Sequence, residues 1–326
     1  MALIRQFLVL LVCSAMVLLR RAVRGPRIVG WTRRFEVLVA IIRHESRRQS
    51  ARPPSQVRAS MLRAPIPRSL QGTVTRERHE IAGRRVEVLT PAGWETGGLT
   101  VLYLHGGGYA VCSPGTHRDT TSRITAAASA RLVVLDYRLA PEHPYPAGVE
   151  DTVAVWRALA SEPGPLAVAG DSAGGGLSLA LMLRLRAAGE PMPTSAVLLS
   201  PWVDLTLSGA SIDAHTDDYL DRPILQRFAD YYLQGTDPMT AEVSPVFADL
   251  RGLPPMLIIT GGSEVFLDEN LQLAERAREA GCDVTVRIGE GMVHAWPAFA
   301  AVVPEARAAL HDAGAFVSRH ASSERH

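Results

Sequence analysis

The stretch Gly-Asp-Ser-Ala-Gly at positions 170–174 decides how the rest of this sequence is interpreted. The apolar run at 166–169 predicts a short buried strand, and residues 174–188 have the length and composition of a helix. Small residues around a serine suit a sharp strand-to-helix turn, because glycines let the neighbouring strands and the helix approach closely. The helix N-terminus beside the turn favours developing negative charge. The sequence therefore predicts a nucleophilic serine, Ser172.

Strand-like and helix-like stretches alternate on both sides of this turn. Apolar runs suited to buried strands occupy residues 99–104, 132–135, 165–169, 196–199 and 256–260, and helical stretches occupy 117–129, 149–161, 174–188 and 268–280. This order predicts an α/β fold in which helices cover both faces of a mostly parallel sheet. Residues 205–240 interrupt the alternation with polar, aromatic and turn residues, so we interpret them as an insertion.

Composition excludes several classes of protein. The chain has 326 residues, 47% of them hydrophobic, so its core can be large without disulfides or a structural metal. The formal net charge of +1 argues against nucleic-acid binding by bulk electrostatics. The three cysteines, Cys13, Cys112 and Cys282, are widely spaced, so we expect neither a disulfide framework nor a zinc site. Lysine is absent, which removes P-loop and Schiff-base lysines from consideration, and we expect no metal and no organic cofactor.

The first segment differs in charge from the rest. Residues 1–70 contain 14 arginines and two acids, a local net charge of +12, whereas the remainder has a net charge of −11. The apolar run 6–19 is short for a bilayer span and is followed by Arg20, Arg21, Arg24 and Arg27. We favour an interfacial helix within residues 1–30 that makes peripheral contact with a membrane; a helix packed on its own protein and a secretory signal are the alternatives. The basic flank predicts a cytoplasmic body, associated with the inner face of the membrane.

A glycine-rich loop, His-Gly-Gly-Gly at 105–108, follows the strand predicted at 99–104. It matches neither phosphate-binding pattern, GxGxxG or GxxxxGK[ST]. We interpret it as an oxyanion hole in which the backbone N–H groups of Gly107, Gly108 and Ala173 bind the developing oxyanion. One such donor typically lowers a reaction barrier by about 3 kcal/mol. We expect His105 to shape the loop rather than to act as a base.

A nucleophilic serine requires a base, and the base requires an orienting acid. His294 lies in a loop just beyond the strand predicted at 284–288, which makes it the candidate base. Glu264 lies in the loop that follows the strand 256–260, at the edge of the sheet where open α/β folds bind ligands. Asp268 is the rival acid, although we expect it to open the following helix as a cap. We favour Glu264 from its loop position.

These motifs resemble those of the hormone-sensitive lipase family of α/β-hydrolases, the bacterial esterases with a His-Gly-Gly-Gly motif. The stretch Asp-Tyr-Arg-Leu-Ala-Pro-Glu-His-Pro-Tyr-Pro-Ala at 136–147 is typical of that family, and residues 116–118, 200–205 and 291–294 are also similar. The resemblance covers roughly residues 31–318. Many members have Asp-Pro-Leu-Arg-Asp where this chain has Glu-Val-Phe-Leu-Asp at 264–268, which is similar to a branch of the family that uses glutamate.

The resemblance implies an α/β-hydrolase fold, with a mostly parallel eight-stranded sheet flanked by helices and a helical cap. The catalytic domain would comprise 71–204 and 241–326, and the cap 31–70 and 205–240. The cap would line an acyl pocket, with Trp202, Tyr219, Phe228 and Tyr231 as wall residues. Their spacing is equally well explained by the ordinary core of a cap.

Together these residues predict a serine carboxylic-ester hydrolase that acts through Ser172, His294 and Glu264 and an acyl-enzyme. By resemblance its substrates are short- to medium-chain acyl esters. The alternatives are an amidase or deacetylase with the same triad, and a catalytically silent ligand-binding protein on the same scaffold. Relatives dimerise through the edge strand and the last helix, so a homodimer is a further candidate.

Overall fold

The computed structural model describes residues 2–61, 63, 66–215 and 219–321. Its centre is an eight-stranded sheet in the order β1-β2-β4-β3-β5-β6-β7-β8. The strands are β1 (Val74–Ile81), β2 (Arg84–Pro91), β3 (Thr100–Leu104), β4 (Arg131–Leu135), β5 (Leu166–Asp171), β6 (Ala196–Leu199), β7 (Met256–Gly261) and β8 (Val284–Gly289). The pairs β1–β2 and β2–β4 are antiparallel and the other pairs are parallel. The prediction of a mostly parallel eight-stranded sheet is therefore confirmed.

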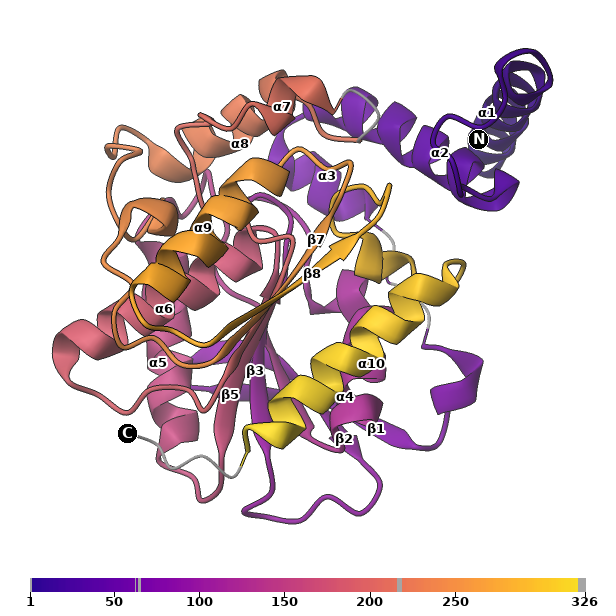
Figure 1. Cartoon of the computed structure of the whole chain (residues 1–326). Coiled ribbons are helices and arrows are strands. Elements are labelled where there is room, and N and C mark those ends of the chain that lie inside the picture. Colours follow the sequence, from indigo (N-terminus) through magenta and orange to yellow (C-terminus); the bar gives the residue numbers. More distant parts are fainter. Residues whose placement is uncertain (1, 62, 64–65, 216–218, 322–326) are drawn as a thin grey trace.

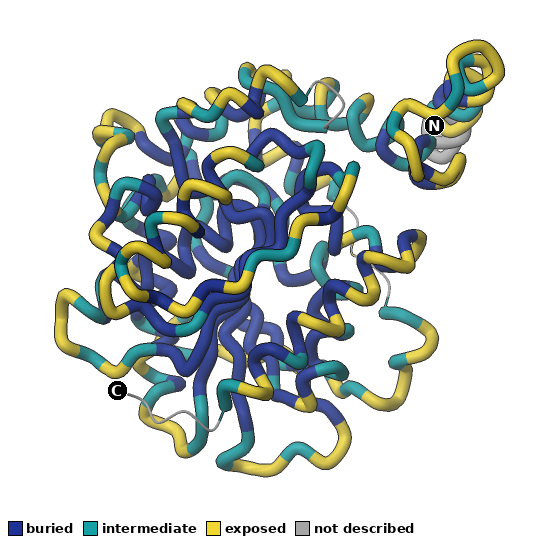
Figure 2. Tube along the Cα trace, viewed as in Figure 1, coloured by how far each residue is buried: buried dark blue, intermediate teal, exposed yellow. Residues whose placement is uncertain are grey.

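Helices cover both faces of this sheet (Figure 1). They are α4 (Arg118–Ala128) and α10 (Pro304–Arg319) on one face, and α5 (Ala147–Ala160), α6 (Ala173–Ala188) and α9 (Leu267–Glu279) on the other. Alternate residues of β3 enter the two cores: Leu102 and Leu104 pack with α5 and α6, whereas Val101 and Tyr103 pack with α4 and α10. The central strands are buried on both faces, which explains their continuous apolar runs (Figure 2).

The N-terminal region and the predicted insertion form further helices, which lie together beyond one end of the sheet, except that α1 projects from the body (Figure 1). These helices are α1 (Ala2–Arg24), α2 (Arg33–Ser50), α3 (Pro54–Ser60), α7 (Ser211–Ala214) and α8 (Arg222–Leu233). Short 3-10 helices occupy η1 (Arg68–Leu70), η2 (Pro114–His117), η3 (Pro245–Phe247) and η4 (Trp296–Phe299). Side chains cap the N-termini of α2 and α8: Thr32 accepts from the Phe35 N–H at 3.2 Å, and Asp221 accepts from the Ile224 N–H at 3.1 Å.

Helix α3 begins at Pro54, because proline suits the first turn of a helix, where no backbone donor is needed. One predicted helix begins two residues earlier than expected. The helix expected from residue 149 begins at Ala147, directly after Pro146. Among the described residues, the helices lack a stretch both long and apolar enough to cross a bilayer.

Candidate active site

The turn between β5 and α6 holds Ser172 in a backbone conformation that serine rarely adopts, with φ +52° and ψ −121°. Its surroundings allow only glycine at two neighbouring positions. A Cβ on Gly174 would lie 1.9 Å from the carbonyl oxygen of Leu104, and one on Gly170 would lie 2.4 Å from that of Gly174. The small residues of this motif therefore let β3, β5 and α6 approach closely enough to force the strained turn.

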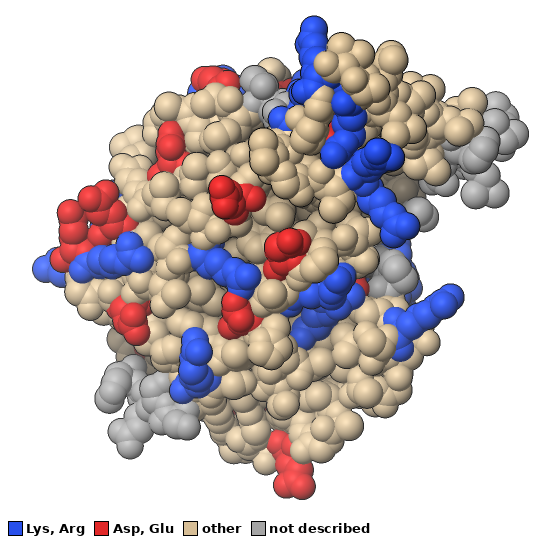
Figure 3. Space-filling view, turned by 45° about the vertical axis from the view of Figure 1, so that its right-hand side comes forward, with Lys and Arg blue, Asp and Glu red and all other residues tan. Residues whose placement is uncertain are grey.

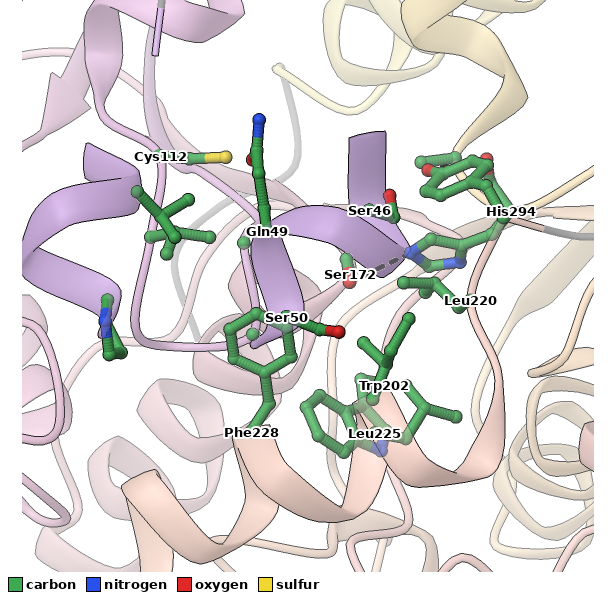
Figure 4. A pocket seen from close by; sticks show the side chains of 18 of the residues that line it. Ser46, Gln49, Ser50, Cys112, Ser172, Trp202, Leu220, Leu225, Phe228 and His294 are labelled. Carbon is green, nitrogen blue, oxygen red and sulfur yellow. Dashed lines mark hydrogen bonds between the residues drawn. The ribbon is translucent and has the colours of Figure 1, made fainter. Parts of the chain in front are cut away.

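The structure brings Ser172 and His294 together although 122 positions separate them in the chain. His294 Nε2 lies 3.0 Å from Ser172 Oγ, and both residues are buried (Figure 4). The edge of the Phe266 ring packs against the imidazole at a centroid distance of 4.9 Å, and the Tyr219 hydroxyl donates to the His294 carbonyl at 3.1 Å. Ring packing and backbone support thus hold the imidazole facing the serine hydroxyl.

Glu264 is fully buried behind His294, with its Oε1 3.8 Å from His294 Nδ1. Its Oε2 accepts hydrogen bonds from Ser200 Oγ and from the Gly261 N–H, each at 2.6 Å. Asn270 Nδ2 donates to Oε1 at 3.3 Å. Three donors therefore compensate a carboxylate that burial alone would disfavour.

The rival acid, Asp268, points elsewhere. It is exposed at the start of α9, and its Oδ2 accepts from the Ser211 N–H at 2.8 Å. Ser211 Oγ in turn accepts from the Asp268 N–H at 3.2 Å. Asp268 thus joins α9 to α7, whereas Glu264 lies beside the histidine.

The glycine-rich loop lies next to the serine. Gly107 and Gly108 have φ values of +113° and +57°, a region that favours glycine, and both line the same cavity as Ser172. A Cβ on Gly108 would lie 2.7 Å from Cγ of Phe228, so a side chain there would clash with the Phe228 side chain of α8. Ala173 is the first residue of α6, where backbone N–H groups have no acceptor within the helix.

A second histidine–carboxylate pair, which sequence reasoning did not identify, supports the loop and lines the same cavity. His117 Nε2 lies 3.1 Å from Asp171 Oδ2, while Asp171 Oδ1 accepts from the Tyr103 hydroxyl at 2.7 Å and from the Gly106 N–H at 3.1 Å. Burial alone would lower the pKa of His117, but the charge and hydrogen bond of Asp171 outweigh it and raise that pKa. Burial would likewise raise the pKa of Asp171, but His117 and the other donors lower it. The two groups form a largely buried ion pair.

His105 has a different position from the two histidines above. Its Nδ1 donates to the Gly106 carbonyl at 2.8 Å, and its ring stacks on Tyr137 at a centroid distance of 4.4 Å. Complete burial is the main cause that lowers the pKa of His105 to about 3, so its imidazole is neutral at pH 7. These contacts are those of a residue that shapes the loop.

A cavity of about 250 Å³ opens in front of Ser172 and His294. All four aromatic residues named from the sequence line it, namely Trp202, Tyr219, Phe228 and Tyr231. Residues of the N-terminal region also line it, and the sequence did not single them out. Ser46, Gln49 and Ser50 come from α2 (Figure 4), and Arg52, Pro54, Val57 and Met61 come from α3 and the residues beside it. Several are polar and lie among arginines, so hydropathy gave no signal that they face a cavity.

Comparisons with known proteins agree with this fold. A family described as having the alpha/beta hydrolase fold matches residues 101–298. An acetyl-hydrolase of Streptomyces hygroscopicus is 46% identical over 228 residues, 68% of this chain and 75% of that protein. An esterase of Acinetobacter venetianus is 36% identical over 224 residues, 67% and 74% of the two chains.

Solved structures give the same result. A hormone-sensitive lipase from a metagenome library has a TM-score of 0.79 and 37% identity, covering 86% of this chain and 97% of that one. EstE5, soaked with p-nitrophenyl butyrate, has a TM-score of 0.78 and 36% identity, covering 86% and 99%. The fold and its relatives define an α/β-hydrolase, and the protein is a hydrolase enzyme. The chain belongs to the hormone-sensitive lipase family, and the names of its relatives support activity on carboxylic esters.

Proposed function

We propose that the protein is a serine carboxylic-ester hydrolase for short- to medium-chain acyl esters, with Ser172, His294 and Glu264 as its triad. The observation that carries the proposal is the 3.0 Å contact between Ser172 Oγ and His294 Nε2 at the wall of an apolar cavity. This distance lies within the hydrogen-bond range that a nucleophile and its general base require.

In the acylation step, Ser172 Oγ attacks the ester carbonyl carbon while His294 Nε2 takes the hydroxyl proton. The negative charge of Glu264 stabilises the imidazolium that forms. The carbonyl oxygen becomes an oxyanion, and the N–H groups of Gly107, Gly108 and Ala173 bind it. His294 then gives its proton to the leaving alkoxide, so the alcohol departs and the acyl group remains on Ser172.

In the deacylation step, water replaces the alcohol. His294 removes a proton from the water as it attacks the acyl carbon, and the second oxyanion occupies the same N–H groups. Collapse of this intermediate breaks the bond to Ser172 Oγ, which regains its proton from His294, and the carboxylic acid is released. These steps use only the chain's own residues and water.

We further propose that residues 31–70 and 205–240 form a cap that limits the acyl chain. Phe228 and Tyr231 of α8 and Val57 of α3 line the cavity from the side opposite the sheet, and Trp202 lines it from the loop after β6. A volume of about 250 Å³ is small among ligand pockets, which favours short and medium acyl chains.

The test is hydrolysis of p-nitrophenyl esters from acetate to dodecanoate by the purified protein and by its Ser172→Ala variant. We expect activity to fall beyond medium chains and kcat to drop by about 10⁴-fold or more in the variant. Anilide and peptide substrates, assayed in parallel, distinguish an amidase. Folded wild type that cleaves no ester, or a Ser172→Ala variant that retains the activity, would overturn the proposal.

A further inference from the structure

Helix α1 exposes a broad apolar surface. Its buried apolar residues, Cys13 and Val17, lie where α1 contacts α2. The exposed apolar residues occupy the remaining sides of the helix, and among the described side chains they are Leu8, Leu10, Leu11, Val12, Met16, Leu18, Leu19 and Val23. Met16 is 66% exposed and Leu19 is 70% exposed, values unusual for such residues on a folded protein.

The C-terminal end of α1 is bound to α2 and to the segment between the two helices. Arg20 and Arg21 both bind the buried carboxylate of Glu36 in α2, at 3.3 and 2.6 Å. Arg21 also donates to the Trp31 carbonyl, and Trp31 Nε1 donates to the Gly291 carbonyl at 2.8 Å. The exposed surface therefore has a defined orientation relative to the loop that carries His294.

Positive charge borders this apolar surface. The end of α1 and the start of α2 present Arg24, Arg33 and Arg34 to solvent, and residues 1–70 as a whole have a net charge of +12. Figure 3 shows arginine side chains gathered beside the projecting hairpin of α1 and α2. An apolar helix face with a basic border is complementary to a lipid surface with anionic headgroups.

The same hairpin leads to the cavity. The first half of α2 packs against α1 and the body, and its last turns contribute Ser46, Gln49 and Ser50 to the cavity lining (Figure 4). A partner bound to α1 would therefore lie close to α2, and α2 forms part of the cavity wall.

We propose that α1 docks the enzyme on an anionic lipid surface, with its axis along the interface and its apolar face among the acyl chains. Docking through this hairpin supplies the cavity with esters dissolved in the lipid surface. The docking stands on the surface of α1 alone, whereas the class of substrate rests on the esterase function proposed above.

The test of docking is flotation of the full-length Ser172→Ala protein with vesicles of phosphatidylcholine and phosphatidylglycerol. Using this variant separates binding from turnover. We expect Met16→Glu with Leu19→Glu to lower the bound fraction by about tenfold, and pure phosphatidylcholine vesicles to bind less protein. The matched control is Met239→Glu with Leu271→Glu, which changes an exposed methionine and an exposed leucine outside α1 and should bind like the parent.

Three results would overturn the docking. The parent could fail to float with anionic vesicles, or the two double variants could bind equally. Light scattering could instead show that the parent is a dimer without lipid and that Met16→Glu with Leu19→Glu is a monomer, while neither floats with vesicles. A second copy of the chain would then cover α1. Circular dichroism and the unfolding temperature establish that each variant is folded.

The substrate class is tested with the active enzyme and Met16→Glu with Leu19→Glu. We expect this variant to hydrolyse dissolved p-nitrophenyl butyrate normally and to lose about tenfold in rate on p-nitrophenyl decanoate carried in anionic vesicles. Equal rates on the vesicle substrate would overturn the lipid-ester inference. If neither enzyme cleaved either ester while flotation persisted, the esterase proposal would fail and the docking would stand.

Discussion

The active-site region contains two histidine–carboxylate pairs, one fully and one largely buried, that differ in what surrounds each imidazole. His117 donates from Nε2 to Asp171 at 3.1 Å, and its Nδ1 lies 2.8 Å from Thr116 Oγ1, which itself donates to a backbone carbonyl. His294 instead directs Nε2 at the strained Ser172, with Glu264 3.8 Å from its Nδ1.

The difference lies in the partners of the two rings. Both nitrogens of His117 meet acceptors, which suits an imidazolium that keeps its proton, and the raised pKa agrees with this arrangement. A general base must accept a proton and release it again, so one ring nitrogen has to face a reacting group. A neighbouring carboxylate alone therefore does not identify a catalytic histidine. The group that faces the other ring nitrogen identifies it.

The largest expected effect comes from truncating each histidine in turn. His294→Ala should lower kcat for p-nitrophenyl butyrate by about 10⁴-fold or more, because it removes the proposed base. His117→Ala should lower kcat by only about 10- to 100-fold, because it loosens the oxyanion loop without removing a reacting group. Steady-state kinetics on both variants measures the contrast, and equal losses would contradict the assignment of roles.

The acids provide the next comparison. Glu264→Gln should lower kcat by about 10³- to 10⁴-fold, because a neutral amide no longer stabilises the imidazolium. Asp268→Asn should leave kcat within about threefold, since Asp268 contacts Ser211 rather than the histidine. A larger loss in Asp268→Asn than in Glu264→Gln would transfer the role of triad acid to Asp268.

We expect the ion pair of His117 and Asp171 to make the free energy of unfolding depend on pH. The pKa of His117 is raised above 6.5, so its contribution to stability is complete below pH 6.5 and is lost as pH rises through the folded-state pKa. The pKa of Asp171 is lowered below 3.8, so its contribution is present above pH 3.8 and is lost in stronger acid. The two contributions overlap between these limits.

The variant His117→Gln breaks this pair, and removing one partner of a buried pair typically costs about 3 kcal/mol. We expect its loss in free energy of unfolding to be largest between about pH 4 and 6.5 and to shrink as pH rises above that window. Urea titrations of wild type and variant at several pH values measure the difference. A loss that grows with pH would contradict the sign of the pKa shift.

The smallest expected effect concerns Glu269, a third buried carboxyl of this region. Burial is the main cause that raises its pKa well above the usual range, although the Val203 N–H donates to it at 2.7 Å. A raised pKa favours the protonated carboxyl, which resembles an amide, so Glu269→Gln should change the free energy of unfolding by less than about 1 kcal/mol at pH 6, and the loss should not grow between pH 6 and pH 8. A loss that grows as pH rises from 6 to 8 would contradict the direction of the pKa shift.

Much of the fold and some of the candidate site could be predicted because the signals are local. The central parallel strands are continuous apolar runs, since both of their faces are buried, and the structure confirms them within one or two residues. The turn at Ser172 and the glycines 106–108 are short motifs that can be recognised from residues next to each other in the chain. Their catalytic roles remain predictions that the variants above test.

The contacts between distant segments could not be predicted in the same way. Asp171 occupies a variable position of its motif, and its partner His117 lies 54 positions earlier. Ser200, which donates to Glu264 and accepts from the Ala295 N–H, joins three segments that are far apart in sequence. No local sequence pattern predicts such a contact, because it forms only when the strands take their places in the folded sheet.

The sequence by itself determined the alternation of strands and helices, the position of the serine turn and the basic, apolar character of the N-terminal segment, since each is visible in residues close together in the chain. Only the tertiary structure decided which carboxylate lies beside His294, which histidine is held as an ion pair, and which side of α1 stays exposed. These depend on the packing of segments separated by tens or hundreds of residues, where burial and opposing charges select one arrangement.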